Sequence, residues 1–218
     1  MYIHEHMIND KCGIMYRIIN RILIFLALAV LIGIVLVSYI PQGQAAFRTL
    51  LFLPQVLPAI PAKPLEWVTK EPTRQEIKFT TNSGQGEADL YLPSGSGKHS
   101  AVLFFLGVFP PEERDDPRIL GLAEGLARSG MVVMIPWLES QNQERIVPSD
   151  IESLINAFQF LSNLKSVDPN RIGIGGICTG ASLSLIASQD ERIRDKVKFV
   201  NFFAGYYDAS DMVKAIGI

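Results

Sequence analysis

The uncharged run Ile22–Ile40 limits what this chain can fold into more than any other feature of the sequence. It contains about 19 residues, and at about 1.5 Å per residue a helix of that length crosses nearly all of the ~30 Å hydrocarbon core of a bilayer. A helix that is apolar on every face for so long is unusual inside a globular protein. The run therefore predicts a transmembrane helix, which makes a membrane one partner of the chain.

The positive charges near this run are unevenly distributed. Three precede it and two follow it: Lys11, Arg17 and Arg21, then Arg48 and Lys63. The positive-inside bias predicts that residues 1–21 are cytoplasmic and that the chain after the helix lies on the other side of the membrane. A cleaved signal peptide is the alternative, with the small residues Gly43–Ala46 as its cleavage site and a secreted product.

Residues 41–73 separate the predicted membrane helix from the rest of the chain. Within this segment, the stretch Phe47–Pro64 is apolar but broken by four closely spaced prolines, Pro54, Pro58, Pro61 and Pro64. Prolines at this spacing are incompatible with one continuous helix. We interpret the segment as a proline-rich linker that lies on the bilayer or on the surface of the following domain.

Charge and cysteine usage exclude several classes of function. The 218 residues carry a net charge of −2 and contain no basic block, so nucleic acid is not an expected partner. Cys12 and Cys178 are far apart and form no C-x-x-C pair, which argues against a zinc site or a thioredoxin-like motif. We expect neither a metal nor a cofactor.

Strands and helices alternate from about Arg74 onward. A hairpin centred on residues 82–84 comes first. Four apolar runs then predict buried strands, at Ser100–Gly107, Met131–Trp137, Arg171–Gly176 and Val197–Gly205, and helical segments lie between them. This order predicts an α/β domain over residues 74–218, with a mostly parallel sheet covered by helices. In such sheets the chemistry lies at the carboxyl ends of the strands.

A cysteine lies in a glycine turn at one of these strand ends. Residues 176–180 read G-I-C-T-G and fit the pattern G-x-nucleophile-x-G, in which small residues must stand two places before and after the nucleophile. Gly176 and Gly180 meet that requirement. Cys178 also precedes a helix, whose dipole favours the thiolate over the thiol. The backbone N–H of Thr179 would then point to where an oxyanion forms.

Two other interpretations of this turn are weighed. Cys178 is also compatible with a small, buried residue at the end of a strand. A dinucleotide-binding turn is disfavoured, because the third glycine of G-x-G-x-x-G would fall at Cys178. No acidic residue ends a following strand about 20 residues later, as that motif requires.

The segment Val167–Leu185 resembles the nucleophile elbow of α/β-hydrolases, and its cysteine makes it most similar to the dienelactone hydrolase family. The resemblance extends from about Arg74 to the end of the chain. It implies a mostly parallel sheet with helices on both faces, and cleavage of a small ester, lactone or thioester without a cofactor. By this resemblance Cys178 is the nucleophile, and the backbone N–H groups of Thr179 and Val108 are the oxyanion donors.

One departure from the family concerns the substrate. Dienelactone hydrolases carry a glutamate directly after the strand that corresponds to Ser100–Gly107. Here that region reads FLGVFPP, and Glu112 and Glu113 come several residues later. The substrate therefore need not be a dienelactone.

The second departure concerns the catalytic base, because no histidine follows Cys178. His99 begins a predicted strand, about 20 Å from its catalytic end. Asp208 and Asp211 follow the last strand and are candidates for the acid or for solvated loop residues. We expect a domain that is C-terminally incomplete, and a non-catalytic binding domain of the same fold is the alternative function.

Overall fold

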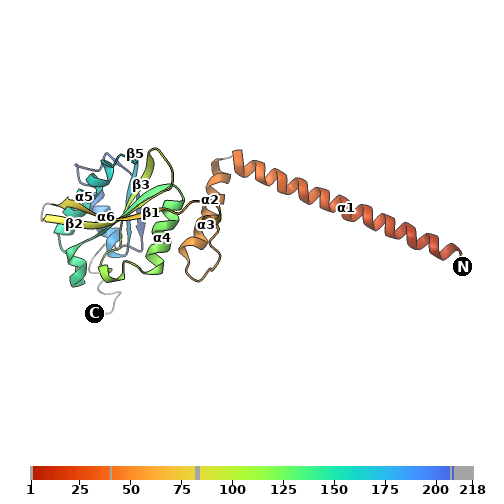
Figure 1. The fold of residues 1–218 in the computed structure, drawn as a ribbon, viewed down its shortest axis with the longest axis horizontal. Helices are drawn as coiled ribbons and strands as arrows, with labels where there is room; N and C mark the ends of the chain where they lie inside the picture. Colours follow the sequence, from red (N-terminus) through yellow and green to blue (C-terminus); the bar gives the residue numbers. More distant parts are fainter. Residues whose placement is uncertain (1, 40, 82–83, 207, 209–218) are drawn as a thin grey trace. The chain divides into compact units, whose positions relative to one another are not determined.

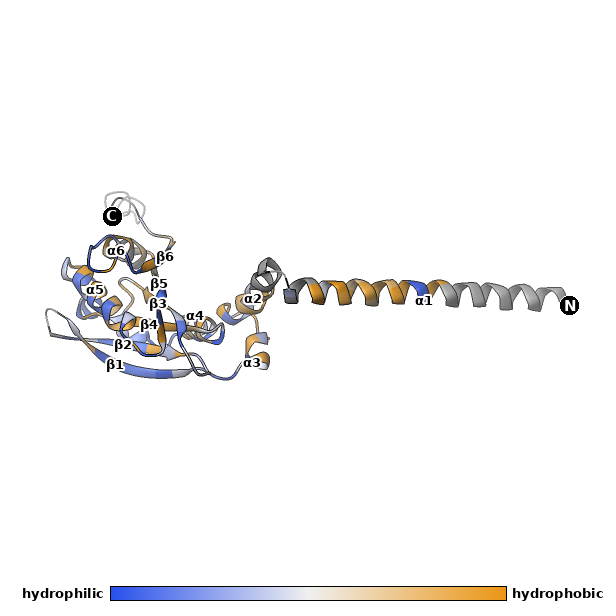
Figure 2. Cartoon of the chain, turned by 90° about the horizontal axis from the view of Figure 1, so that it is seen from above, coloured by the Kyte–Doolittle hydropathy of each residue, from blue (hydrophilic) through white to orange (hydrophobic). Residues whose placement is uncertain are grey.

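The computed structural model describes residues 2–39, 41–81, 84–206 and 208, and its contacts divide the chain into two units after Leu50 (Figure 1). The first unit contains helix α1 (Tyr2–Tyr39). Its segment Ile18–Val35 is long and apolar enough to cross a membrane, and it forms most of the orange stretch of α1 in Figure 2. This segment begins four residues before the predicted Ile22 and includes Arg21. A signal sequence near the N-terminus would satisfy the same criteria of length and composition.

The linker is in large part helical although, as predicted, it is not one continuous helix. Helix α2 (Pro41–Val56) continues through Pro54, and α3 (Pro64–Val68) follows after a break. Pro54 lies in the last turn of α2, where its missing N–H removes only the hydrogen bond to the carbonyl of Leu50. The last carbonyl groups of a helix have no helical donor. Lys63 Nζ donates to the carbonyl oxygens of Pro54 at 2.7 Å, Gln55 at 3.3 Å and Leu57 at 3.0 Å. The lysine ammonium therefore satisfies the exposed end of the helix and stabilises it despite the proline.

The second unit is built on a six-stranded sheet with the order β1-β2-β4-β3-β5-β6. The strands are β1 (Thr73–Thr81), β2 (Gly84–Leu92), β3 (His99–Phe105), β4 (Met131–Trp137), β5 (Val167–Ile177) and β6 (Val197–Phe203). β1 and β2 form the predicted antiparallel hairpin, and β2 also runs antiparallel to β4. The neighbouring pairs among β4, β3, β5 and β6 are parallel. The prediction of a mostly parallel sheet is confirmed.

Helices cover both faces of this sheet, as predicted. The principal ones are α4 (Pro117–Arg128), α5 (Ser149–Ser162) and α6 (Thr179–Ser188), and short 3₁₀ turns η1 (Pro111–Glu113) and η2 (Glu139–Gln143) follow β3 and β4. α5 and α6 bury Phe158 and Leu183 in one core, whereas α4 buries Ile119 in a second core with Val133 of β4. Because side chains alternate along a strand, β3 and β4 contribute to both cores, whereas the buried apolar side chains of β5 lie in the first.

The second unit begins before the first strand. Gly121 and Gly125 of α4 face the end of α2, and a Cβ at Gly121 would lie 2.8 Å from the carbonyl oxygen of Gln55. A Cβ at Gly125 would lie 3.0 Å from the ring of Phe52. The two glycines let α2 and α4 approach closely, so this part of the expected linker packs on the α/β unit.

Candidate functional site

Cys178 occupies a sharp turn between β5 and α6. Its backbone has φ 55° and ψ −129°, a region that side-chain-bearing residues rarely adopt, and its thiol is free and exposed. The interpretation of Cys178 as a buried residue is therefore wrong. Its N–H donates to the carbonyl oxygen of Phe203 at the end of β6, at 3.0 Å. Such a backbone costs about 1–3 kcal/mol, and strain of this kind is concentrated at functional sites.

The two glycines of the turn allow three pieces of backbone to meet. A Cβ at Gly180 would collide with the carbonyl oxygen of Phe105 and lie 2.5 Å from the N of Gly107. A Cβ at Gly176 would collide with the same Phe105 oxygen and lie 2.6 Å from the carbonyl carbon of Gly180. The pattern G-x-C-x-G is thus required by contact between the turn and the end of β3.

We expect Gly180→Ala to destabilise the protein and to reduce the reactivity of Cys178. Overpacking against backbone typically costs about 1–3 kcal/mol, because the end of β3 must shift to admit the methyl group. The free energy of unfolding in urea and the rate of thiol alkylation measure the two effects. Gly33→Ala is the control, since a Cβ there would meet nothing within 4 Å. Equal stability of the two variants would contradict this packing.

The loop after β3 lies directly against the first turn of α6. Gly107 has φ 74°, and a Cβ there would collide with Thr179 Oγ1 and lie 2.7 Å from the N of Gly180. Val108 follows and is 37% exposed. Within the described part of the chain, the N–H groups of Val108 and Thr179 donate to no backbone carbonyl. The two expected oxyanion donors therefore come from adjacent segments.

The remaining residues considered as catalytic base or acid, His99, Asp208 and Asp211, lie in different parts of the chain. His99 begins β3 and so lies at the opposite end of that strand from Gly107. Asp208 is exposed in the segment after β6, while Asp211 lies outside the described residues. That segment is held on α6, because Ser182 Oγ donates to the Tyr206 carbonyl oxygen at 2.8 Å and accepts from its N–H at 3.0 Å.

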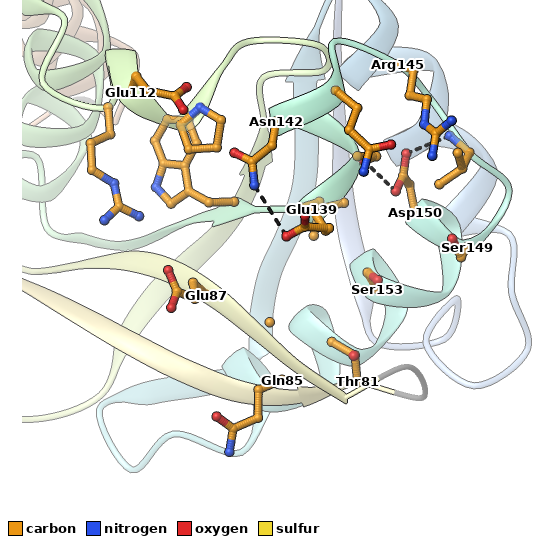
Figure 3. Close-up of a pocket in the computed structure, with 18 residues that line it drawn as sticks. Thr81, Gln85, Glu87, Glu112, Glu139, Asn142, Arg145, Ser149, Asp150 and Ser153 are labelled. Carbon is orange, nitrogen blue, oxygen red and sulfur yellow. Dashed lines mark hydrogen bonds between the residues drawn. The ribbon is translucent and has the colours of Figure 1, made fainter.

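A cleft of about 770 Å³ opens at the carboxyl end of β4 (Figure 3). Its walls come from the start of β2, from η1 and η2, and from the start of α5, and they include Glu87, Glu112, Glu139, Arg145 and Asp150. Asp150 shapes this wall, since its carboxylate accepts from Ser140 Oγ at 2.7 Å and from the N–H of Val147 at 2.9 Å. The cleft and Cys178 lie at the same edge of the sheet, where the parallel strands end, although Cys178 does not line the cleft.

The sequence analysis did not single out Gln141, although its side chain contacts the loop that carries Val108. It belongs to η2 and is 1% exposed. Its side-chain amide donates to the carbonyl oxygens of Gly107 and Phe109, which lie 34 and 32 residues earlier in the sequence. No local sequence pattern indicates contacts over such distances.

Comparison with solved structures finds the same fold in esterases of low sequence identity. No family model matches the chain, and no curated protein matches it. An esterase from the hyperthermophilic archaeon Pyrobaculum calidifontis superposes with a TM-score of 0.52 at 18% identity, covering 78% of this chain and 52% of that one. Acetyl xylan esterase 1 from Thermoanaerobacterium sp. superposes with a TM-score of 0.53 at 15% identity, covering 68% of this chain and 53% of that one.

A hypothetical protein from Pseudomonas aeruginosa is 27% identical over 61% of this chain and 42% of its own, with a TM-score of 0.49. The chain therefore spans about half the length of the solved structures that it matches. Its sheet order, its helices on both faces and its esterase neighbours define the α/β-hydrolase fold.

Proposed function

We propose that this chain is a membrane-anchored hydrolase, similar to dienelactone hydrolases, that cleaves a small ester, lactone or thioester through Cys178. The observation that carries the proposal is the exposed thiol on a turn with φ 55° between β5 and α6. A structural cysteine has no need of this conformation, whereas a nucleophile gains access to a substrate at the edge of the sheet. The esterase neighbours support the same class of reaction.

The proposed reaction begins when the Cys178 thiolate attacks the carbonyl carbon of the substrate. A C–S bond forms, the carbonyl electron pair moves onto oxygen, and the N–H groups of Thr179 and Val108 donate to that oxyanion. Collapse of the intermediate re-forms the carbonyl, breaks the bond to the leaving alkoxide or thiolate, and leaves an acyl-thioester. Water then attacks the thioester, its proton passes to a base, and the Cys178 thiolate is regenerated.

The second step is where this chain departs from a complete triad. No histidine follows Cys178, and His99 lies at the far end of β3. General-base assistance typically contributes about 10²–10⁴-fold in rate. We therefore propose that the 218 residues acylate at Cys178 and deacylate slowly, with Asp208 or Asp211 as candidates for the acid once a histidine is supplied.

A non-catalytic binding domain of the same fold is the second candidate function, since His99, at the far end of β3, cannot assist Cys178 as a base. The two functions are separated by release of p-nitrophenolate from p-nitrophenyl acetate. A nucleophile predicts a burst of one equivalent per chain that depends on Cys178, whereas a binding domain predicts none.

We expect the full chain to sediment with membranes and to resist extraction by high salt or carbonate. The apolar segment Ile18–Val35 is the reason, because it can cross the bilayer once. An arginine at the centre of such a helix costs about 2.5–3.5 kcal/mol on insertion scales, so Leu28→Arg with Val30→Arg should shift the protein toward the soluble fraction. Leu28→Ala is the matched control and should stay in the membrane. Recovery of a soluble protein that begins near Ala46 would instead establish a cleaved signal peptide.

A further inference from the structure

A single buried side chain holds the loop that carries Val108. Gln141 Nε2 donates to the carbonyl oxygen of Gly107 at 2.7 Å and to that of Phe109 at 2.9 Å. Its Oε1 accepts from the N–H of Leu138 at 2.7 Å. Both donor hydrogens of the amide are thus used, and the carbonyl groups on either side of Val108 are bound by the same nitrogen.

The bond to Gly107 acts on the peptide unit that contains the Val108 N–H. The carbonyl of Gly107 and the N–H of Val108 belong to one planar peptide group, in which C=O and N–H point in opposite directions. Fixing the carbonyl on Gln141 therefore fixes the direction of the N–H on the other side of the loop. Donation to the carbonyl also polarises the peptide group and strengthens the N–H as a donor.

Burial makes this arrangement stiff. Gln141 is 1% exposed, so water cannot replace its hydrogen bonds, and a hydrogen bond is electrostatically stronger in a protein interior than in water. Gly107 has φ 74°, and a glycine has more backbone freedom than any other residue, so without these hydrogen bonds the loop could adopt other conformations. The loop bends at Gly107, and the hydrogen bonds from Gln141 hold it on both sides of Val108, the proposed oxyanion donor.

We infer that Gln141 is a positioning residue for catalysis, which orients the Val108 N–H toward the oxyanion. This inference rests on the proposed function, because it assigns a role within the same reaction. Gln141 does not contact the reacting atoms and acts through the peptide group between Gly107 and Val108. It also links this loop to η2, which forms one wall of the cleft in Figure 3.

The test compares two reactions of the same thiol in the full chain in mild detergent. Acylation of Cys178 by p-nitrophenyl acetate passes through an oxyanion, whereas alkylation by iodoacetamide displaces iodide from carbon and does not. At about pH 9, where an unperturbed cysteine thiol is largely ionised, both rates can be measured as single turnovers. We expect Gln141→Leu to slow acylation about 10- to 100-fold, in the range expected when a catalytic group is misplaced by about 1 Å. The alkylation rate should change less than about threefold.

A second variant separates positioning from a structural role. Gln141→Glu keeps an acceptor for the N–H of Leu138 but, when ionised, has no donor for the Gly107 and Phe109 carbonyls. We expect it to slow acylation as much as Gln141→Leu does. Gln189→Leu is the control, since Gln189 is an exposed glutamine at the C-terminal end of α6.

The outcomes are distinct. Unchanged acylation in Gln141→Leu, or equal losses of acylation and alkylation, would overturn the positioning role. Wild-type acylation in Gln141→Glu would show that only the bond to Leu138 matters, which also overturns it. A wild-type protein that is not acylated at all would instead contradict the proposed function, so the two failures can be told apart.

Discussion

Cys178→Ala is expected to abolish the burst of p-nitrophenolate that the unmodified chain releases from p-nitrophenyl acetate. Without the sulfur no acyl-thioester can form, so release should fall to the rate of the buffer alone. The proposed oxyanion donors, the N–H groups of Val108 and Thr179, cannot compensate, because an oxyanion hole stabilises an intermediate that the missing nucleophile has to create. The assay is a single-turnover measurement of absorbance in mild detergent.

The chain supplies its own matched control. Cys12 is the other cysteine of the sequence, and Cys12→Ala should retain the full burst. A version of the protein extended to supply an aspartate and a histidine should turn over about 10²–10⁴-fold faster than the 218 residues, and Cys178→Ala should abolish that activity as well. Hydrolysis by the extended Cys178→Ala protein at the parental rate would show that Cys178 is structural.

The largest expected loss of stability follows from Asp89, a carboxylate of β2 that is 1% exposed. Its Oδ2 accepts from Trp137 Nε1 at 2.8 Å and from Arg74 Nη2 at 3.1 Å, and it lies 3.8 Å from Arg114 Nε. Removing Asp89 leaves the Trp137 indole N–H without this acceptor, and leaves Arg74 and Arg114 with Asp115 and Glu76 as their carboxylate partners. Breaking a buried ion pair typically costs about 3–5 kcal/mol. We expect Asp89→Ala to lower the free energy of unfolding in urea by about that amount.

Two residues that surround Asp89 also line the cleft. Arg114 lies over the ring of Trp137, 5.4 Å from its centroid, and both residues line the cleft at the end of β4. Glu87→Ala is the control for the Asp89 variant, since Glu87 lies two residues earlier in β2 and forms an exposed pair with Lys78 at 3.5 Å. Exposed pairs contribute about 0–1 kcal/mol, so this variant should unfold close to the wild type. Similar losses in the two variants would contradict the role given to Asp89.

The sequence was sufficient for features that local patterns determine. The turn at Cys178 was predicted because the requirement for glycine two places before and after it is itself local, and the structure shows which backbone atoms impose it. The parallel strands were predicted from apolar runs such as Ser100–Gly107, since a strand buried on both faces needs apolar residues throughout. The hairpin of β1 and β2 was visible in the alternation on either side of its turn.

Interactions between segments that are far apart in the sequence could not be predicted from local patterns. The end of the helix through Pro54 is bound by the ammonium group of Lys63, nine residues later, which donates to the carbonyl groups there. The clamp formed by Gln141 joins segments that are 32 to 34 residues apart. The cluster at Asp89 joins β1, β2, β4 and Arg114, the residue after η1, and only the folded chain brings these together. In each case the role of a polar side chain depends on hydrogen-bond partners whose positions cannot be predicted from local sequence patterns.

The central claim is that Cys178 forms a covalent acyl-thioester at the turn between β5 and α6. Mass spectrometry of the peptide that contains it, after brief treatment of the full chain with p-nitrophenyl acetate and quenching in acid, measures this most directly. The account predicts one acetyl group per chain, on Cys178, which hydroxylamine removes and which does not form after prior alkylation of the thiol. Acetyl groups confined to lysine side chains, with Cys178 unmodified, would contradict it.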